Sequence, residues 1–168
     1  MMRLIRALVC VFALCAPASA AERFAPMQKM CSLAGEWEGV VLTNPGGPTG
    51  PGAHIKYEAV SNGYAVVETL TMHNEHHMIS VYYQEGDQLM MTHFCSSNTQ
   101  PRLRTKSIPA DLSEFKLEFV DSTNIMKANW MNIVWMKVEF LKDGRIRQSW
   151  KTHDEHEVAC VMEFQRVK

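Results

Sequence analysis

Histidines and carboxylates gather in two short polar segments of the chain. Residues 73–77 read HNEHH and residues 153–157 read HDEHE. Imidazole and carboxylate groups that converge from two loops can bind zinc or copper, and nearby methionine or cysteine favours the softer copper ion. Neither segment matches a defined zinc motif, and solvated loops also tolerate histidine, so both readings stay open. The candidate metal ligands are His73, His76, His153 and His156.

A second group of reactive side chains lies in the middle of the chain, among apolar residues. An enzyme could use His77, His93 or Tyr83 for acid–base chemistry. A nucleophile pair of His93 and Cys95 is disfavoured, because same-face neighbours on a strand are about 7 Å apart and no third group orients the histidine. Enzyme chemistry is therefore the third hypothesis, after binding of a small molecule and binding of a metal.

The amino-acid composition limits the class of protein to which these residues belong. The 168 residues are 46% hydrophobic and 21% charged, with a formal net charge of -1. This balance is typical of one globular domain and excludes a disordered chain, a collagen and a coiled coil. The sequence has no block of basic residues that could follow a phosphate backbone, which disfavours nucleic acid as a partner.

The first twenty residues have the pattern of a secretory signal peptide. Arg3 and Arg6 form a positively charged start, residues 7–16 are apolar, and residues 18–20 (ASA) form a small-residue cleavage site. The apolar run is too short to span a bilayer, and no later segment reaches the length of a transmembrane helix without charges. We therefore predict a signal peptide at 1–20 and one exported domain at 21–168, periplasmic or secreted.

Apolar residues recur with a period of two along almost the whole predicted domain. This period is typical of β-strands and not of helices, so the predicted fold class is all-β. Only residues 26–33 favour a helix, directly before the first strand. The predicted strands are 34–42, 53–60, 64–71, 77–84, 88–95, 102–107, 115–120, 132–141, 145–152 and 157–166.

Tight and long connections alternate along most of this series of strands. Tight turns with Gly or Asn occur at 61–63, 85–87 and 142–144. In an up-and-down sheet, alternate turns lie at opposite ends, so tight turns close one end and long loops surround the other. The pattern predicts a closed up-and-down antiparallel barrel of about ten strands, with the short N-terminal helix plugging the tight end. The long connections hold residues 43–52, 73–76, 96–101, 121–131 and 153–156.

Several motifs resemble a known family. Residues 33–39 (LAGEWEG) look like the Gly-x-Trp opening of lipocalin-like (calycin-type) barrels, in which the tryptophan closes the floor. Residues 81–83 (VYY), 86–95 (GDQLMMTHFC), 100–102 (QPR) and 143–150 (DGRIRQSW) extend the similarity to a group of uncharacterised bacterial lipocalin-like secreted proteins, over roughly residues 33–168. The resemblance implies a barrel and no known reaction. The chain departs from the group in its many histidines and methionines and in Cys31 and Cys160.

Pairing across the hairpins assigns side chains to the two faces of the sheet. If Gln84 opposes Gln88 across a three-residue turn, one apolar face points inward on both strands. His77, His93 and Cys95 then continue that face toward the open end. The predicted interior residues are Ile79, Val81, Tyr83, Leu89 and Met91 in this hairpin, and Val134, Met136, Val138, Phe140, Ile146, Gln148, Trp150 and Thr152 in the hairpin at 142–144.

In the strand pair 53–60 and 64–71, the charged residues decide the faces. We predict that Lys56 and Glu68 point outward, because that choice leaves no unpaired charge in the core. The other predicted interior residues are Trp37, Val41, Tyr57, Val67, Thr69, Val158, Cys160, Met162 and Phe164.

An apolar interior with a few polar groups near one end is typical of a small-molecule pocket. A core filled by its own side chains is the alternative, and ten strands favour a hollow barrel over a filled one. We predict an exported binding protein for a small hydrophobic or amphipathic molecule, with the ligand, any cofactor and the oligomeric state left open. The candidate ligand-binding residues are Trp37, Tyr57, His77, Ile79, Tyr83, Met91, His93, Cys95, Met136, Gln148 and Trp150.

The predicted domain contains three cysteines, an odd number for an oxidising compartment. Cys31 precedes the first strand at the tight end, whereas Cys95 and Cys160 lie near the open end. A strand of eight residues spans roughly 26 Å, so Cys31 is out of disulfide reach of the other two. A bridge between Cys95 and Cys160 needs a flattened barrel, and we expect free thiols.

Overall fold

The computed structural model describes residues 24–45, 47–73, 76–125, 132–152 and 160–168, so the predicted signal peptide lies outside the described residues. Within these ranges, helix α1 (Ala25–Cys31) precedes ten strands, and a short 3-10 turn at Ser61–Gly63 joins the second strand to the third. The strands are β1 (Gly35–Thr43), β2 (Gly50–Val60), β3 (Ala65–Met72), β4 (His76–Glu85), β5 (Gln88–Phe94), β6 (Gln100–Thr105), β7 (Glu114–Thr123), β8 (Ile133–Phe140), β9 (Ile146–Thr152) and β10 (Cys160–Arg166).

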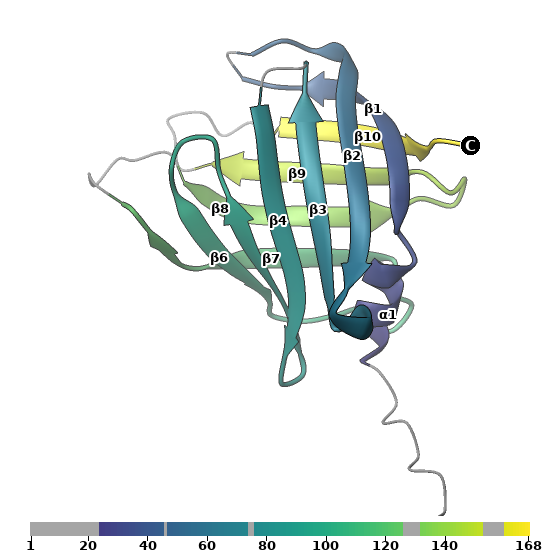
Figure 1. Ribbon diagram of the computed structural model, residues 1–168, viewed down its shortest axis with the longest axis vertical. Helices are drawn as coiled ribbons and strands as arrows, with labels where there is room; N and C mark the ends of the chain where they lie inside the picture. Colours follow the sequence, from purple (N-terminus) through teal and green to yellow (C-terminus); the bar gives the residue numbers. More distant parts are fainter. Residues whose placement is uncertain (1–23, 46, 74–75, 126–131, 153–159) are drawn as a thin grey trace, which may run out of the picture.

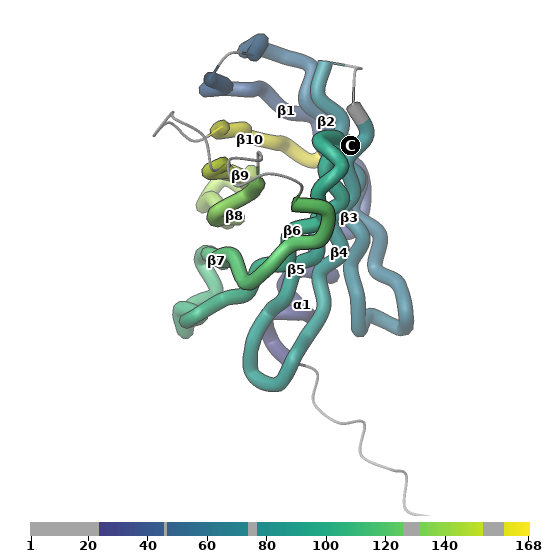
Figure 2. Tube along the Cα trace, turned by 90° about the vertical axis from the view of Figure 1, so that its left-hand side faces the viewer, coloured from purple at the N-terminus to yellow at the C-terminus, as the bar shows by residue number. Residues whose placement is uncertain are grey.

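The strands form one closed antiparallel barrel in which each strand pairs with its neighbours in sequence (Figure 1). The last strand returns to the first, where Trp37 pairs with Arg166 and Val41 with Met162. In Figure 1, β2, β3 and β4 run along the long axis in front of β8, β9 and β10, which run across it, and Figure 2 shows the two sets as separate walls. The predicted ten-stranded up-and-down barrel is confirmed. Closure leaves no unpaired sheet edge among the ten described strands.

Helix α1 lies against β2, β3 and β4 at the end where the tight turns gather. Pro26 stands in its first turn, where a missing backbone N–H costs no hydrogen bond. Met27 and Met30 are buried and belong to the same apolar core as the barrel interior. Directly after the helix, the indole of Trp37 donates a hydrogen bond of 2.9 Å to the carbonyl of Leu33. The helix thus closes this end of the barrel.

The register of the β4–β5 hairpin differs from the prediction by one residue. Glu85 pairs with Gln88, so the turn contains two residues, and its first residue, Gly86, has a φ of 60°. A shift of one residue turns every side chain of a strand to the opposite face. Strand β5 keeps its predicted face, and β4 is reversed. Ser80 and Tyr82 are buried inside, whereas the predictions for His77, Ile79, Val81 and Tyr83 are wrong.

Strand β3 is also reversed relative to the prediction. Its buried residues are Val66, Glu68 and Leu70, and the alternate positions Val67 and Thr69 point away from the interior. The prediction placed Glu68 outside because an unpaired carboxylate cannot remain in an apolar core. That premise does not apply here, because this carboxylate is surrounded by hydrogen-bond donors.

In strands β8 and β9 the predicted faces are confirmed except at one position. Met136 pairs with Trp150 and Val138 with Gln148, and all four side chains are buried. The register then shifts before Trp135, so that Ile133 pairs with Thr152. This bulge places an extra residue in β8, which buries Ile133 and leaves Val134 exposed. The inward positions of Trp37, Val41, Tyr57, Met162 and Phe164 are confirmed, and Val158 lies outside the described residues.

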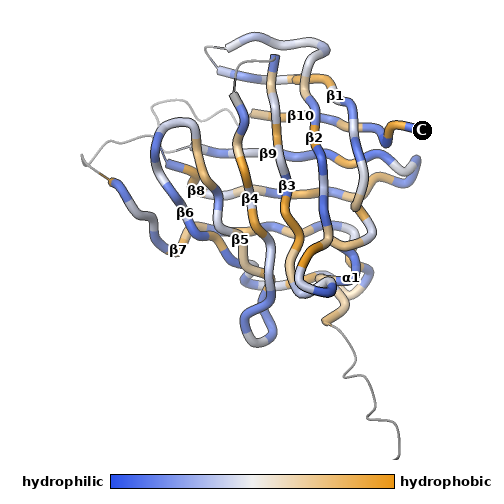
Figure 3. The backbone as a smooth tube through the Cα atoms, in the orientation of Figure 1, coloured by the Kyte–Doolittle hydropathy of each residue, from blue (hydrophilic) through white to orange (hydrophobic). Residues whose placement is uncertain are grey.

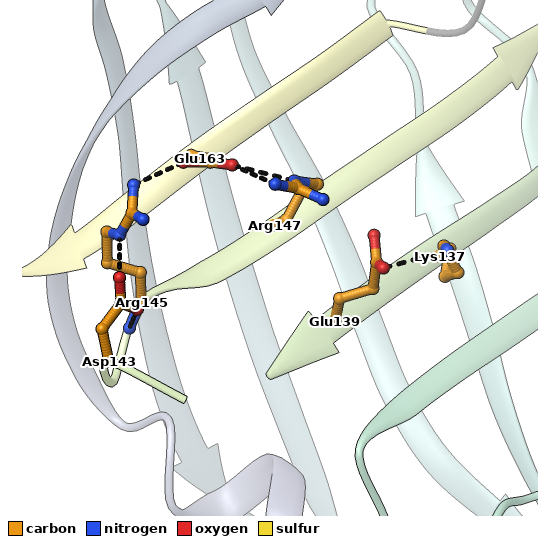
Figure 4. A network of polar contacts seen from close by, with 6 residues as sticks. All are labelled: Lys137, Glu139, Asp143, Arg145, Arg147 and Glu163. Carbon is orange, nitrogen blue, oxygen red and sulfur yellow. Dashed lines mark hydrogen bonds and ion pairs between the residues drawn. The ribbon is translucent and has the colours of Figure 1, made fainter. Parts of the chain in front are cut away.

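The outer face of β8, β9 and β10 carries paired charges. Glu163 accepts hydrogen bonds from Arg145 and Arg147 at 2.5 Å, and Arg145 also contacts Asp143 (Figure 4). The backbone coloured by hydropathy shows the matching alternation of polar and apolar positions along the strands (Figure 3). These pairs keep the outer face polar. Among the described residues, no helix is long and apolar enough to cross a membrane.

Candidate functional site

The interior of the barrel opens into a pocket of about 230 Å³ at the end away from helix α1. Its walls come from all five long connections or the strand ends beside them, as the alternation of tight and long loops predicted. The lining is mainly apolar and rich in sulfur. It consists of Asn44, Pro45, Leu70, Met72, Met78, His93, Cys95, Ser96, Ile133, Trp150, Thr152, Cys160 and Met162.

Three larger depressions lie outside the barrel among the described residues, and the smallest of them, of about 360 Å³, is lined by Glu38 and residues 165–168. The second, of about 380 Å³, is lined by Phe24 and Pro26 beside helix α1 and by residues 105–110. The third, of about 400 Å³, lies along β1 and β10 next to the ion pairs of Arg145 and Glu163. All three are more open to solvent and less apolar than the interior pocket. The interior pocket therefore has the composition expected for a ligand site.

His93 and Trp150 supply the polar rings of the pocket wall, which also contains Asn44, Ser96 and Thr152. Their rings meet edge to face with centroids 5.0 Å apart, and the exposed fractions of the two residues are 1% and 7%. The indole N–H of Trp150 donates a hydrogen bond of 3.1 Å to Oε1 of Gln148. Nδ1 of His93 lies 3.0 Å from the hydroxyl of Ser80. Both rings are therefore hydrogen-bonded to polar groups that lie deeper in the barrel.

Those deeper groups surround the carboxylate of Glu68, which is fully buried. Oε2 accepts hydrogen bonds from Nε2 of Gln148 at 2.6 Å and from the hydroxyl of Tyr82 at 3.0 Å. Oε1 accepts one from Ser80 at 3.2 Å. Tyr57 also hydrogen-bonds to Glu68, and its hydroxyl oxygen accepts from Gln148 at 2.8 Å. We call these residues, together with His93 and Trp150, the Glu68 network.

Burial sets the protonation of the network. Burial raises the pKa of Glu68 above its usual value, and the four donors around the carboxylate oppose that rise. Burial and the neighbouring Glu68 charge raise the pKa of Tyr57 and Tyr82 well above the usual value, so both phenols keep their protons. Burial lowers the pKa of His93 to about 4. At neutral pH the imidazole in the pocket wall is uncharged.

The predicted separation of the three cysteines is confirmed. Cys31 is at the closed end, where its thiol lies 3.5 Å from the carbonyl of Gly63. Cys95 and Cys160 both line the pocket, and each of the three is a free thiol. Burial raises the pKa of Cys160 to about 11, which keeps it protonated at neutral pH. Cys160 is therefore part of an apolar wall and is not an activated nucleophile.

The structure divides the predicted ligand-binding residues into four groups. His93, Cys95 and Trp150 lie together in the pocket wall. Tyr57 and Gln148 belong to the Glu68 network, and Met91, Met136 and Trp37 are buried in the core without lining the pocket. His77, Ile79 and Tyr83 are on the other face of β4: His77 is exposed and hydrogen-bonds to Thr71, and Tyr83 hydrogen-bonds to Thr92.

Glu68, Ser80 and Tyr82 are central to the network and were not among the residues predicted from the sequence. All three are on the two strands whose faces were reversed. The alternation of β4 gave no signal for Ser80 or Tyr82, because these residues and Gln84 form the more polar face of the strand, which the period-two pattern places outward. The assumed three-residue turn placed the same face outward.

Three of the four candidate metal ligands have side chains outside the described residues. His153 and His156 lie outside the described residues, as does the side chain of His76. Nε2 of His73 is buried without a hydrogen-bond partner in the part of the chain that the structure describes. Within that part, no group of three or more His, Cys, Asp or Glu side chains is arranged to hold a metal ion.

Comparisons with known proteins add no identity to this geometry. No protein-family model matches the chain, and the search of curated proteins finds no matching relative.

Proposed function

We propose that this protein is an exported, lipocalin-like binding protein that holds a small hydrophobic or amphipathic molecule in the open end of its barrel. The single observation that carries the proposal is the pocket of about 230 Å³, whose apolar wall is interrupted by His93 and Trp150. Such a wall removes the apolar part of a ligand from water and orients its polar part with few groups.

The volume limits the size of the ligand. A water-sized group occupies about 30 Å³ of liquid, so the pocket encloses roughly eight non-hydrogen atoms. A long-chain fatty acid, with about 18 to 20 non-hydrogen atoms, is more than twice this size. The proposed ligand is therefore a short-chain or single-ring molecule, or the end of a longer molecule whose remainder projects past the loops.

A second candidate function is binding of copper(I), which prefers soft sulfur ligands. Met72, Met78 and Met162 line the pocket together with Cys95 and Cys160. The burial of Cys160 argues against this candidate, because a thiol with a pKa of about 11 must lose its proton before it can bind a metal as thiolate. Binding of an organic molecule requires no such step and is the first proposal.

The test uses 1-heptanol, which has eight non-hydrogen atoms, as a probe of matched size. Trp150 lies in the pocket wall, so we expect binding to change the tryptophan fluorescence of the full chain saturably. Isothermal titration gives the affinity independently. The absence of saturable binding for 1-heptanol and for ring compounds of the same size would reject the proposed function.

Two neighbouring substitutions locate the binding. Cys160→Phe places a ring in the pocket and should lower the affinity at least tenfold. Val161→Phe adds the same ring at the next position, whose side chain points to the other face of β10, and should leave the affinity unchanged. Equal effects of the two variants would place the binding site elsewhere.

A further inference from the structure

The hydrogen bonds of the Glu68 network run in one donor-to-acceptor direction. The indole of Trp150 sets this direction. An indole N–H is only a donor, so Oε1 of Gln148 must accept from it. The amide nitrogen of Gln148 then faces the network with both of its protons. One points to the hydroxyl of Tyr57 at 2.8 Å and the other to Oε2 of Glu68 at 2.6 Å. The orientation of the Gln148 amide is thus set by the indole of Trp150, which can donate a hydrogen bond but cannot accept one.

Donors and acceptors can be assigned in the same way for the two tyrosines and the carboxylate of Glu68. Because the oxygen of Tyr57 accepts from Gln148, its own proton is directed to Glu68. Tyr82 contributes a further donor to Oε2. Glu68 is therefore surrounded by donors, and an ionised carboxylate, which only accepts, satisfies all of them. A neutral carboxylic acid would direct a proton of its own at one of these donors.

Ser80 links Glu68 to His93 in the pocket wall and fixes the donor-to-acceptor direction there. Its single proton points to Oε1 of Glu68, so its oxygen must accept from Nδ1 of His93. A neutral imidazole has one N–H, and that proton is then on Nδ1. Nε2 carries only a lone pair. In the described part of the chain Nε2 has no hydrogen-bond partner, and the ring that bears it lines the pocket.

We infer that the Glu68 network holds His93 as the Nδ1–H tautomer, so that the pocket presents a bare Nε2 acceptor and selects uncharged molecules that donate a hydrogen bond, such as alcohols. This inference rests on the proposed function and specifies its ligand class. An ether or ester of the same size fills the apolar wall and leaves Nε2 unpaired. The network acts through His93, so Glu68 and Ser80 are positioning residues.

The first test reads the tautomer without any ligand. Two-bond proton–nitrogen correlations in the ¹⁵N-labelled full chain distinguish a protonated from an unprotonated ring nitrogen, and the spectrum of His93→Phe identifies the His93 signals. We expect the proton of His93 on Nδ1 at neutral pH. A proton on Nε2 would overturn the inference, because Ser80 would then donate to Nδ1 of His93 and no longer to Glu68.

The second test compares two isomers, 1-heptanol and hexyl methyl ether, which differ in the ability to donate. In His93→Phe, which keeps a ring beside Trp150, the ratio of the heptanol affinity to the ether affinity should fall about fivefold, the factor of one neutral hydrogen bond. Val161→Leu, a change on the other face of β10 and outside the pocket lining, should leave this ratio unchanged. An unchanged ratio in His93→Phe overturns the inference while the proposed function stands. Failure of both isomers to bind the unmodified protein overturns both.

A third test reverses the donor-to-acceptor direction of the hydrogen bonds that link residue 68, Ser80 and His93. In Glu68→Gln the amide oxygen must face Gln148 and Tyr82, so the amide nitrogen faces Ser80. The Ser80 proton then turns to Nδ1 of His93, and the imidazole proton moves to Nε2. We expect the other tautomer in the spectrum and a stronger affinity for the ether. A folded Glu68→Gln protein that keeps the Nδ1 proton contradicts the inference, and the first two tests do not depend on this variant.

Discussion

The Gln148 amide and the Glu68 carboxylate lie 2.6 Å apart across the barrel interior. Gln148 comes from β9 and Glu68 from β3, which belong to the two walls that cross in Figure 1. A buried charge that is hydrogen-bonded by the opposite wall ties the walls together, because neither group can satisfy its polar atoms alone.

We expect Gln148→Leu to lower the free energy of unfolding by about 2 to 4 kcal/mol, because Glu68 and Trp150 both lose a partner in a buried site. Urea denaturation measures the change. The double variant Glu68→Leu/Gln148→Leu should be less unstable than the sum of its single variants, since it buries no unpaired charge. Asp121→Asn, which breaks an exposed ion pair with Arg102, is the control and should leave the midpoint almost unchanged. A Gln148→Leu midpoint equal to that of the control would contradict the assigned role.

The depressed pKa of His93 predicts a loss of stability in acid. The folded protein keeps His93 neutral down to a pH of about 4, whereas the unfolded chain protonates it below about 6.5. The unfolded state therefore binds more protons in this window, and stability falls as the pH falls through it. Relative to His93→Phe, the unmodified protein should lose roughly 3 kcal/mol between about pH 7 and pH 4.

Glu68 acts in the opposite direction, since its raised pKa makes acid favour the folded state. This contribution is present in both proteins and largely cancels in their difference. Denaturant midpoints measured for the pair across the window test the prediction. Parallel curves for the two proteins would show that His93 titrates normally in the folded state.

The cysteines predict a pattern of chemical modification. Because burial raises the pKa of Cys160 to about 11, its alkylation by iodoacetamide should be slow at neutral pH and accelerate in alkali. Saturating 1-heptanol should slow the alkylation of Cys95 and Cys160, which line the pocket, and leave Cys31 at the closed end unaffected. Peptide mass spectrometry reads each site. Equal protection of all three thiols would indicate a global effect of the alcohol and no occupancy of the pocket.

The histidine-rich segments carry a prediction from the sequence alone. A defined metal site predicts one tightly bound copper or zinc ion in equilibrium dialysis, lost when His76 and His156 are both changed to alanine. We expect weak binding that is insensitive to this pair, as solvated loop histidines would give. One tight ion that disappears in the double variant would establish the metal site instead.

Strand positions and the ends of the barrel followed from local chemistry. The period-two pattern of residues such as Trp37, Val41, Met162 and Phe164 is repeated in every strand that packs one face on a core. Glycine and asparagine marked the tight turns, because residues 61–63, 86 and 144 adopt positive φ there. Both signals arise within a few residues, so the sequence carries them without knowledge of the rest of the chain.

The faces of β3 and β4 could not be obtained in the same way. The segment 85–87 is compatible with turns of two or three residues, and the choice between them turns β4 over. The bulge beside Val134 likewise depends on how β8 fits β9. Register is a property of two paired strands and of the core that both cover. The pattern of one strand does not contain it.

The all-β class, the order of the strands and the end of the barrel at which a pocket opens all follow from the pattern of residues along the chain. The burial of Glu68 depends instead on the folded barrel, because its partners Tyr57, Tyr82, Ser80 and Gln148 come from β2, β4 and β9. A rule that keeps charges out of a core is correct for an isolated carboxylate. It fails when donors far apart in the sequence converge on one carboxylate, and that convergence exists only in the closed barrel.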